Sequence, residues 1–364
     1  MKSFFTKMAA LTTLFVLLSV FNLSAKDKDA EIRKDLKERL PYLMGSNNAG
    51  TLFYLAFHPC WETNSNGNAL RIYVSSAVAT TVRLEIKGLG IFRQKMTVPN
   101  DVIDFMLTPS EGQPYTKTDQ VKPLPEQIWE GRAVKIWADD PIIVYGVTRF
   151  YATSDGYLAL PASALGNNYQ VSSYADPTNN TFQWLPSYTS IVGIYDNTRV
   201  TFRMGGCESC YALKEDGDYL TFNQTIRRTL NEGDVWLIPG IGAFNDLTGS
   251  TVKANKPINV ISGNFCAYIP SHVAACDFII EQEMPENVWG KKYHVTPIAT
   301  RKNYSLIKIF AKKPFTQVYS DGLPAWYIQT PGGIYGSGYI EARAGVMALV
   351  MPHQNLSKYL LMKQ

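Results

Sequence analysis

Three acidic residues occupy matching places in two similar stretches of the chain, where a pair of carboxyl groups could do acid–base chemistry. Asp155 precedes the run "GYLAL", and Asp277 precedes "FIIEQEM", which contains Glu281. A glycoside hydrolase needs two carboxyl groups about 5–10 Å apart across one cleft. Asp155 and Asp277 stand at equivalent places in two copies of one unit, which favours the same turn-capping role twice. Glu281 and Gln282 are expected to bond backbone groups between units, with ligand contact as the alternative.

The five cysteines could form disulfides, a metal site or a redox pair. Cys266 and Cys276 lie ten residues apart, Cys207 and Cys210 form a Cys-x-x-Cys, and Cys60 is left over. In an exported chain such pairs form disulfides, so we predict Cys266 with Cys276 and Cys207 with Cys210. A zinc site from these four cysteines would need each pair to be spaced by about two to four residues, whereas Cys266 and Cys276 are ten apart. A thioredoxin-like pair would need a strand-to-helix setting, and turn residues surround Cys207.

Other catalytic signatures are missing from the sequence. It has no Gly-x-Ser-x-Gly and no phosphate-binding loop, and the glycine-rich "TPGGIYGSGY" is expected to be a hairpin. The histidines have no metal-ligand spacing; they are His58, His272, His294 and His353. The sequence therefore predicts no cofactor, no bound metal and no enzymatic activity.

The first 25 residues resemble a cleavable signal peptide. Lys2 and Lys7 precede the apolar run "MAALTTLFVLLSV", and Ala25 is a small residue suited to cleavage. A membrane anchor is the alternative, but the run is short and contains Thr and Ser. We expect a secreted or cell-surface protein.

Composition favours β structure. The 364 residues include 21 Tyr, 20 Pro and 26 Gly, and the net charge of +4 comes from scattered charges of both signs. These numbers fit a globular chain with many turns and give no argument for nucleic-acid binding. Residues 27–44 form the one helix-like segment, with Ile32, Leu36 and Leu40 spaced along one face.

An internal repeat organises the rest of the chain. Aligning Pro141 with Pro257 matches "VKIWADDPIIVYG" to "TVKANKPINVISG", and Gly-x-x-Tyr recurs at Gly166 and Gly290. A third, shorter copy ends in "YIEARAGVMALVM", with Gly345 at the proline position. A unit of about 100 residues has the size of a β-sandwich, whereas propeller blades repeat every 40 to 50 residues or so.

We therefore predict an all-β fold of tandem, mutually packed sandwich-like units with one short N-terminal helix. The expected limits are a signal peptide at 1–25, a helix and linker at 26–48, and units at 49–180, 181–300 and 301–364. The third unit is expected to be partial, which allows self-association through it.

These stretches resemble the IgGFc-binding protein N-terminal domain family over residues 50–364. The resemblance rests on "GTLFYLAF", "SSAVATTVRLEIKG", "DDPIIVYG", "DGYLALPASALGNNYQVSSY", "NKPINVISGNFC" and "CDFIIEQEMPENVWGKKYHV". Within them the family pattern includes, in order, Asp155, Tyr169, Cys266, Cys276, Asp277, Glu281, Gln282, Trp289 and Tyr293. Cys60, Cys207 and Cys210 depart from it.

The resemblance implies an exported, non-enzymatic binding or adhesion module whose partner is an extracellular protein or glycan. A carbohydrate-active enzyme and a structural subunit of a surface layer or fibre are the alternatives. Tyr169 and Tyr293 come just before the next expected copy begins, so we expect each to join its unit to the next one.

Overall fold

The computed structural model describes residues 48–63, 69–115, 123–175, 184–205, 210–241, 246–269, 275–293, 306–313, 315–320, 323–328, 333–336 and 340–351. These residues form three units of antiparallel strands, and one long strand runs through the middle of each unit. No helix among the described residues is long and apolar enough to cross a membrane.

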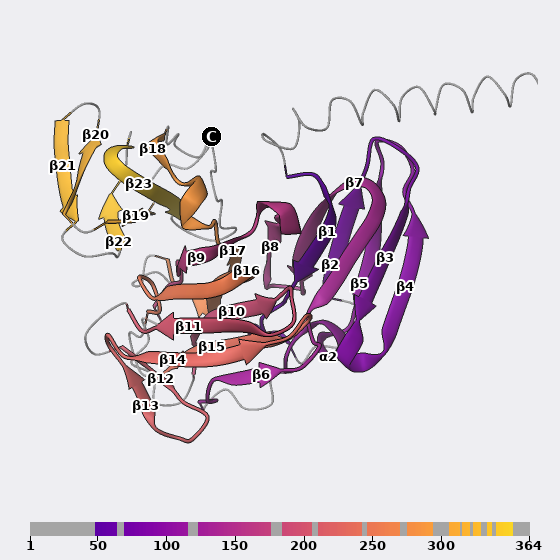
Figure 1. Ribbon diagram of the computed structural model, residues 1–364, viewed down its shortest axis with the longest axis horizontal. Helices are drawn as coiled ribbons and strands as arrows, with labels where there is room; N and C mark the ends of the chain where they lie inside the picture. Colours follow the sequence, from indigo (N-terminus) through magenta and orange to yellow (C-terminus); the bar gives the residue numbers. More distant parts are fainter. Residues whose placement is uncertain are drawn as a thin grey trace, which may run out of the picture. The chain divides into compact units, whose positions relative to one another are not determined.

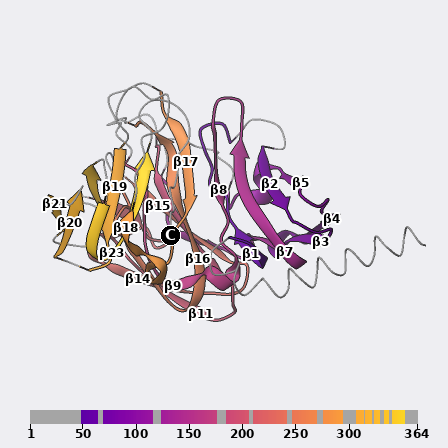
Figure 2. The ribbon, with the colours of Figure 1, turned by 90° about the horizontal axis from the view of Figure 1, so that it is seen from above.

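The first unit is built around β7 (Val134–Arg149). The amino-terminal half of β7 pairs with β1 (Gly50–Leu55) and with β3 (Thr81–Ile86), which pairs in turn with β4 (Ile91–Met96). The carboxyl-terminal half pairs with β8 (Ser154–Leu158) and with β2 (Leu70–Ser75), which pairs with β5 (Val102–Leu107). Figure 2 shows β7 as a single long arrow shared by both sets of strands. The short elements η1 (Lys87–Leu89) and α2 (Pro109–Gly112) follow β3 and β5.

The second unit repeats this plan around β16 (Thr251–Ala267). One half of β16 pairs with β9 (Gly166–Gln170) and β11 (Thr198–Arg203), and β14 (Thr225–Leu230) follows β11. The other half pairs with β17 (Asp277–Gln282) and β10 (Ser187–Gly193), and β15 (Val235–Ile241) follows β10. The additional strands are β12 (Tyr211–Leu213), β13 (Tyr219–Thr221) and β6 (Gln127–Trp129). Because β6 precedes β7 in the chain yet pairs with β15, it ties the first two units together. Figure 1 shows the strands of the second unit side by side.

The third unit follows the same plan around β23 (Ile340–Met351). β18 (Gly290–Tyr293) and β20 (Thr316–Ser320) pair with its first part, and β21 (Leu323–Ile328) pairs with β20. β19 (Leu306–Ala311) pairs with its second part, and β22 (Gly333–Gly336) pairs with β19. Residues 352–364, where a counterpart of β8 and β17 would fall, lie outside the described residues.

Each long strand changes its partners where the aligned Pro or Gly lies. Pro141 separates the β3 ladder from the β2 ladder, and Pro257 separates the β11 ladder from the β10 ladder. Proline has no N–H to donate, so it fits where a ladder is interrupted. Beside these points Gly50 lies opposite Ile142, and Gly166 lies opposite Ile258.

The glycine that opens each of the first two units is required by a close approach. A Cβ on Gly50 would lie 2.4 Å from Pro161 Cβ, and one on Gly166 would lie 2.6 Å from Pro285 Cβ. Each proline follows the last strand of the same unit, before η2 (Ala162–Ala164) or η3 (Glu286–Val288). The repeated proline and glycine therefore bring the start and end of a unit together.

Burial shows how the first two units pack. Side chains of β7 alternate between buried and more exposed, whereas β10, β15 and residues 258–267 of β16 are buried at every position. Ile191, Trp236 and Val260 pack in the core of the second unit, while Val192, Val235 and Ile261 pack in the core of the first. One sheet of the second unit thus contributes to two cores.

The all-β fold of packed sandwich-like units is confirmed. The signal peptide and the helix at 27–44 lie outside the described residues. The unit limits at 180 and 300 stay predictions, but the pairing of β9 with β16 and of β18 with β23 favours new units beginning at Gly166 and Gly290.

Tyr169 packs in the core around β16, and its expected role in joining one unit to the next stays a prediction. Its ring is buried with Val171, Ile191 and Val252. Its hydroxyl accepts from Gly166 N at 2.8 Å and donates to Ile258 O at 2.7 Å, which ties β9 to β16 across the bend. Tyr293 accepts the equivalent bond from Gly290 N at 2.8 Å, at a more exposed place.

We expect Tyr169→Phe to lower the free energy of unfolding by about 1–3 kcal/mol, because it leaves a buried carbonyl and amide without their partner. Tyr293→Phe is the matched control and should cost less, because water can replace its hydroxyl. Urea unfolding of both variants measures the difference, and equal losses would contradict this role for Tyr169.

Candidate functional site

The outward side of β4, β3, β7 and β1 carries aromatic and charged side chains, which we call the first-unit outer face. Cross-strand register places Phe92, Glu85, Lys135 and Tyr54 in one row. The next row contains Gln94, Arg83, Trp137 and Leu52. The opposite side of these strands carries the core residues Val82, Leu84, Val134 and Ile136. Alternation along a strand therefore places the two rows on the side opposite these core residues, where Tyr54 is nevertheless buried at 2% exposed.

Aromatic rings and ion pairs hold the outer face in place. The ring centres of Phe92 and Trp137 lie 6.0 Å apart, and Phe92 is 56% exposed. Lys135 Nζ lies 5.4 Å from the Trp137 ring centre and 5.8 Å from that of Tyr54, within cation–π range. Arg83 donates to both carboxylate oxygens of Asp139, at 3.0 and 3.3 Å.

A cavity of about 170 Å³ opens where this face meets the second unit. Its lining includes Tyr54, Glu85, Lys87 and Lys135 from the first unit and Glu232 from the second. Glu232 Oε1 accepts from Lys135 Nζ at 2.5 Å and from the Tyr54 hydroxyl at 2.6 Å. The site is therefore completed by residues far apart in the sequence.

The turn that carries Glu232 is fixed from several sides. Asp234, almost fully buried, accepts from Asn231 N at 2.7 Å and from Gly131 N of the first unit at 2.9 Å. Gly233 has φ of 88°, a left-handed conformation that glycine adopts without strain, and its carbonyl accepts from Ala133 N. Glu232 is thus positioned before any ligand arrives.

The electrostatics of the cavity favour binding over acid catalysis. Hydrogen bonds from Lys135 and Tyr54 lower the pKa of Glu232, so its carboxyl group stays ionised. Burial raises the pKa of Tyr54 well above its ordinary value, so the phenol stays a donor. A glycosidase acid needs the opposite shift, a carboxyl group that keeps its proton near neutral pH.

The predicted acids lie at the seam between the first two units, away from that cavity's lining. Asp155 Oδ1 accepts from Gly156 N, and Asp277 Oδ1 accepts from Phe278 N, each at 2.8 Å. Asp155 Oδ2 also accepts from Ile280 N at 2.9 Å, and Gln282 Oε1 accepts from Leu160 N at 2.9 Å. The first of these longer-range bonds joins β8 to β17, and the second joins Leu160, just after β8, to β17. Ligand contact by these acids stays a prediction.

The remaining family-motif residues lie at the start of the third unit. Trp289 Nε1 donates to Met284 O at 3.0 Å, and its ring packs beside the buried Phe310. Gln282 is followed by Glu283, whose carboxylate accepts from Ser172 N at 2.6 Å. A structural role for the family-motif residues stays a prediction.

The cysteine predictions have different outcomes. Cys266 and Cys276 form a disulfide with Cα atoms 5.1 Å apart, as predicted. Cys210 is disulfide-bonded, while Cys207 lies outside the described residues. Cys60 is a free, buried thiol, and burial raises its pKa to about 12, so it is protonated at physiological pH.

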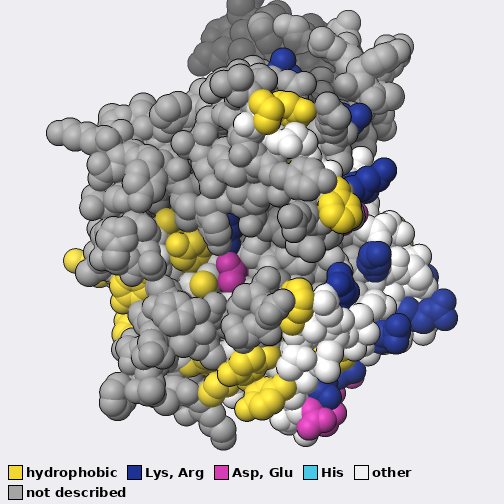
Figure 3. All heavy atoms as spheres, turned by 90° about the vertical axis from the view of Figure 1, so that its left-hand side faces the viewer, with side chains coloured by type: hydrophobic (Ala, Val, Ile, Leu, Met, Phe, Trp, Pro, Cys, Tyr) yellow, Lys and Arg dark blue, Asp and Glu magenta, His cyan; other side chains and the backbone are white. Residues whose placement is uncertain are grey.

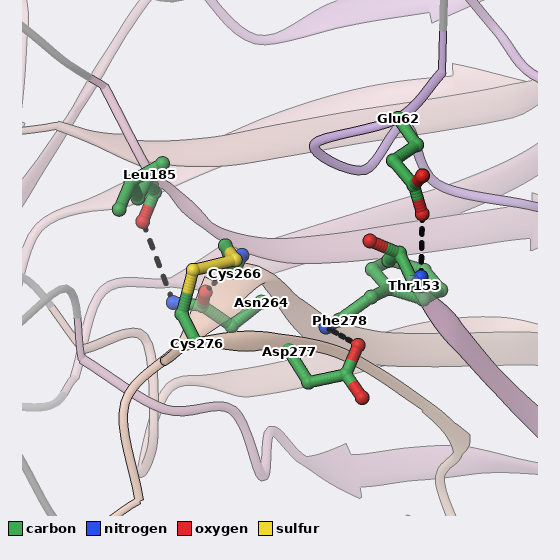
Figure 4. Close-up of a disulfide and its surroundings, with 8 residues drawn as sticks. All are labelled: Glu62, Thr153, Leu185, Asn264, Cys266, Cys276, Asp277 and Phe278. Atoms are coloured by element: carbon green, nitrogen blue, oxygen red, sulfur yellow. Dashed lines mark hydrogen bonds between the residues drawn. A yellow bond between two sulfur atoms is a disulfide. The ribbon is translucent and has the colours of Figure 1, made fainter. Parts of the chain in front are cut away.

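Asp277 is the carboxyl group with a raised pKa at this seam (Figure 4). Burial raises its pKa to about 6, and the nearby charge of Glu62 adds to the shift. The Glu62 carboxylate accepts from Ala152 N and Thr153 N in the connection between β7 and β8.

Sequence reasoning missed the outer face and the buried Lys308. Lys308 donates to Asp246 Oδ2 and Ser173 O at 2.7 Å each, and burial lowers its pKa while Asp246 opposes that shift.

The alternating Lys135, Trp137 and Asp139 mark outward positions of β7 and could have indicated the outer face. Glu232 had no such signal. Over the described ranges, no cluster of His, Cys, Asp and Glu could hold a metal ion.

The described residues form an all-β module of several packed units. The pattern of the IgGFc binding protein family matches residues 155–345, more than half of the chain, so the chain belongs to that family. The human IgGFc-binding protein is 26% identical over 210 residues, which cover 58% of this chain and 3% of that relative. No solved structure matches. The family is one of binding proteins.

Replacing Cys266 and Cys276 with Ser should lower the free energy of unfolding by about 2–3 kcal/mol, because the disulfide closes a short loop in the unfolded chain. Guanidinium unfolding of the oxidised parent and the double variant measures this loss. Cys60→Ser is a control outside the disulfide, and a double variant as stable as the oxidised parent would contradict the prediction.

Asp277→Asn should become stabilising relative to the parent as pH rises from 4 to 7. An unfolded Asp titrates near pH 3.9, whereas folded Asp277 titrates near 6. The folded state thus holds an extra proton between these values, and the parent loses stability as pH rises through that window. Asparagine has no proton to lose and keeps the bond to Phe278 N.

Thermal unfolding at pH 4, 5, 6 and 7 tests this expectation. Asp101→Asn is the matched control, because Asp101 bonds Val102 N in the same way from an exposed position. A constant difference between Asp277→Asn and the parent across this range would contradict the raised pKa.

Proposed function

We propose that this protein is an exported, non-enzymatic module that binds an extracellular glycoprotein through the first-unit outer face. The observation that carries the proposal is the exposed Phe92 ring against the half-buried Trp137 ring, beside the fixed Lys135–Glu232 pair. Family membership supports binding, and the name of the human relative states that it binds immunoglobulin Fc. The apolar amino-terminal run and the Cys266–Cys276 disulfide support export.

The outer face has the chemistry of a binding hot spot. Exposed aromatic rings offer large apolar area with few rotatable bonds, and Trp, Tyr and Arg dominate the binding energy of many interfaces. The ion pairs and cation–π contacts already fix these side chains, so little order is lost on binding. The cavity beside them adds a place for one polar group of the ligand.

A second exposed apolar surface makes a useful comparison. Tyr145 is 45% exposed on the carboxyl-terminal half of β7, and Val102 and Met106 are exposed on β5. The cavity with convergent charged groups adjoins the first-unit outer face and is lined by Tyr54, Lys135 and Glu232. The first-unit outer face is therefore the preferred site.

The test is surface plasmon resonance of the mature protein over two immobilised glycoproteins, an immunoglobulin Fc fragment and a purified secreted mucin. The protein should retain at least one of the two glycoproteins, and that glycoprotein should be recovered uncleaved. The double variant Phe92→Ala/Trp137→Ala should weaken binding of the same glycoprotein by at least about 2 kcal/mol, or roughly 30-fold.

Tyr145→Ala is the matched control, since it removes an exposed aromatic ring from the other half of β7. It should bind as the parent does. Loss of binding in Tyr145→Ala alone would place the site on the other surface. Release of cleaved glycans or peptides from either glycoprotein would overturn the non-enzymatic proposal.

A further inference from the structure

The second unit carries a cationic surface where the first unit carries its aromatic outer face. β9, β11, β14 and the first half of β16 correspond to β1, β3, β4 and the first half of β7. Their outward positions include Arg199 and Arg203 on β11, Arg227 on β14 and Lys253 on β16, all exposed. We call these four residues the basic face. Figure 3 shows Lys and Arg side chains gathered along one side of that view.

The strand register places the four cations around Thr201. Thr201 lies opposite Arg227 on one side and Lys253 on the other. Arg227 and Lys253 are therefore two strand spacings apart, about 9–10 Å between backbones, while Arg199 and Arg203 are about 13–14 Å apart along β11. One small anion cannot reach all four, but a chain of repeated anions can.

The basic face has no internal neutralisation. None of β9, β11, β14 and β16 contains an Asp or Glu. Among the described residues, no salt bridge includes any of the four cations, although Arg203 donates to Asn223 Oδ1. In the first unit, by contrast, Arg83 pairs with Asp139 and Lys135 pairs with Glu232. Uncompensated like charges cost stability, which suggests that they serve binding.

We propose that the basic face binds a sulfated polysaccharide chain. Guanidinium forks donate two parallel hydrogen bonds to sulfate oxygens, and sulfate esters stay ionised at all physiological pH values. Thr201, Thr225, Thr229 and Thr251 stand between the cations and offer hydroxyl groups to the sugar. This proposal rests on the proposed extracellular binding function and names a ligand class for a different surface.

Nucleic acid fits this surface less well. Single strands bind through aromatic side chains that stack on the bases, and the outward positions of these four strands carry no aromatic residue. The face is also a flat sheet rather than a helix or ribbon that enters a groove.

The test measures binding of heparin, chemically desulfated heparin and a 20-base-pair DNA duplex by calorimetry at 150 mM salt. Heparin should bind the parent, and desulfated heparin should not. Arg199→Ser/Arg227→Ser/Lys253→Ser should raise the dissociation constant for heparin by at least about tenfold, because each change removes a charged donor.

The control variant is Arg149→Ser/Lys291→Ser/Lys312→Ser, which removes the same charge at exposed positions outside the basic face. It should bind heparin within about twofold of the parent. An equal loss in both variants, or DNA binding as tight as heparin binding, would overturn the proposal. Because Phe92→Ala/Trp137→Ala leaves the basic face intact, it should keep heparin binding. A result against glycoprotein binding by the first-unit outer face is then distinguishable from a result against heparin binding by the basic face.

Discussion

The sheet of the second unit that is buried on both sides is the element on which the rest of the structure depends. β10, β15 and the second half of β16 send one set of side chains into their own core and the other set into the core of the first unit, and β17 adds Phe278 and Ile280 to the core of the first unit. Burial of Val192, Val235 and Ile261 in the core of the first unit contributes roughly 1.5–3 kcal/mol for each side chain. The first unit would otherwise expose an open apolar side.

Polar groups set the register of that contact. Asn259 Nδ2 donates to Tyr54 O at 2.6 Å, and His58 Nε2 lies 2.8 Å from Ser190 Oγ. A buried donor without a partner costs about 1–3 kcal/mol, so a shifted arrangement of the two units would lose these bonds. The same contact positions Tyr54 beside Glu232. The cavity at the seam is therefore a consequence of how the units pack, and its charged groups are fixed by the scaffold.

The sequence predicted much of the fold and little of the site. Repeated landmarks such as Pro141 and Pro257 identified the long strands, because a missing N–H and an alternating pattern are local properties. The Cys266–Cys276 pairing was predictable for the same reason. The place of Tyr169 could not be predicted. Gly166 and Tyr169 directly follow the first copy in the chain, but their strand β9 pairs with β16 of the second unit. The burial of Lys308 had no signal in the sequence, because its partner Asp246 lies about sixty positions away. Glu232 reaches Lys135 only after two units have docked.

Hydrogen–deuterium exchange of the protein alone and bound to whichever of the two glycoproteins it retains, the Fc fragment or the mucin, tests the central claim, that the first-unit outer face is a preformed binding surface. The account predicts slower exchange on binding in peptides that cover β3, β4 and residues 134–139, with β10 and β15 already protected in the free protein. Protection that appears only outside the first-unit outer face, or a seam that exchanges rapidly until the ligand is added, would contradict it.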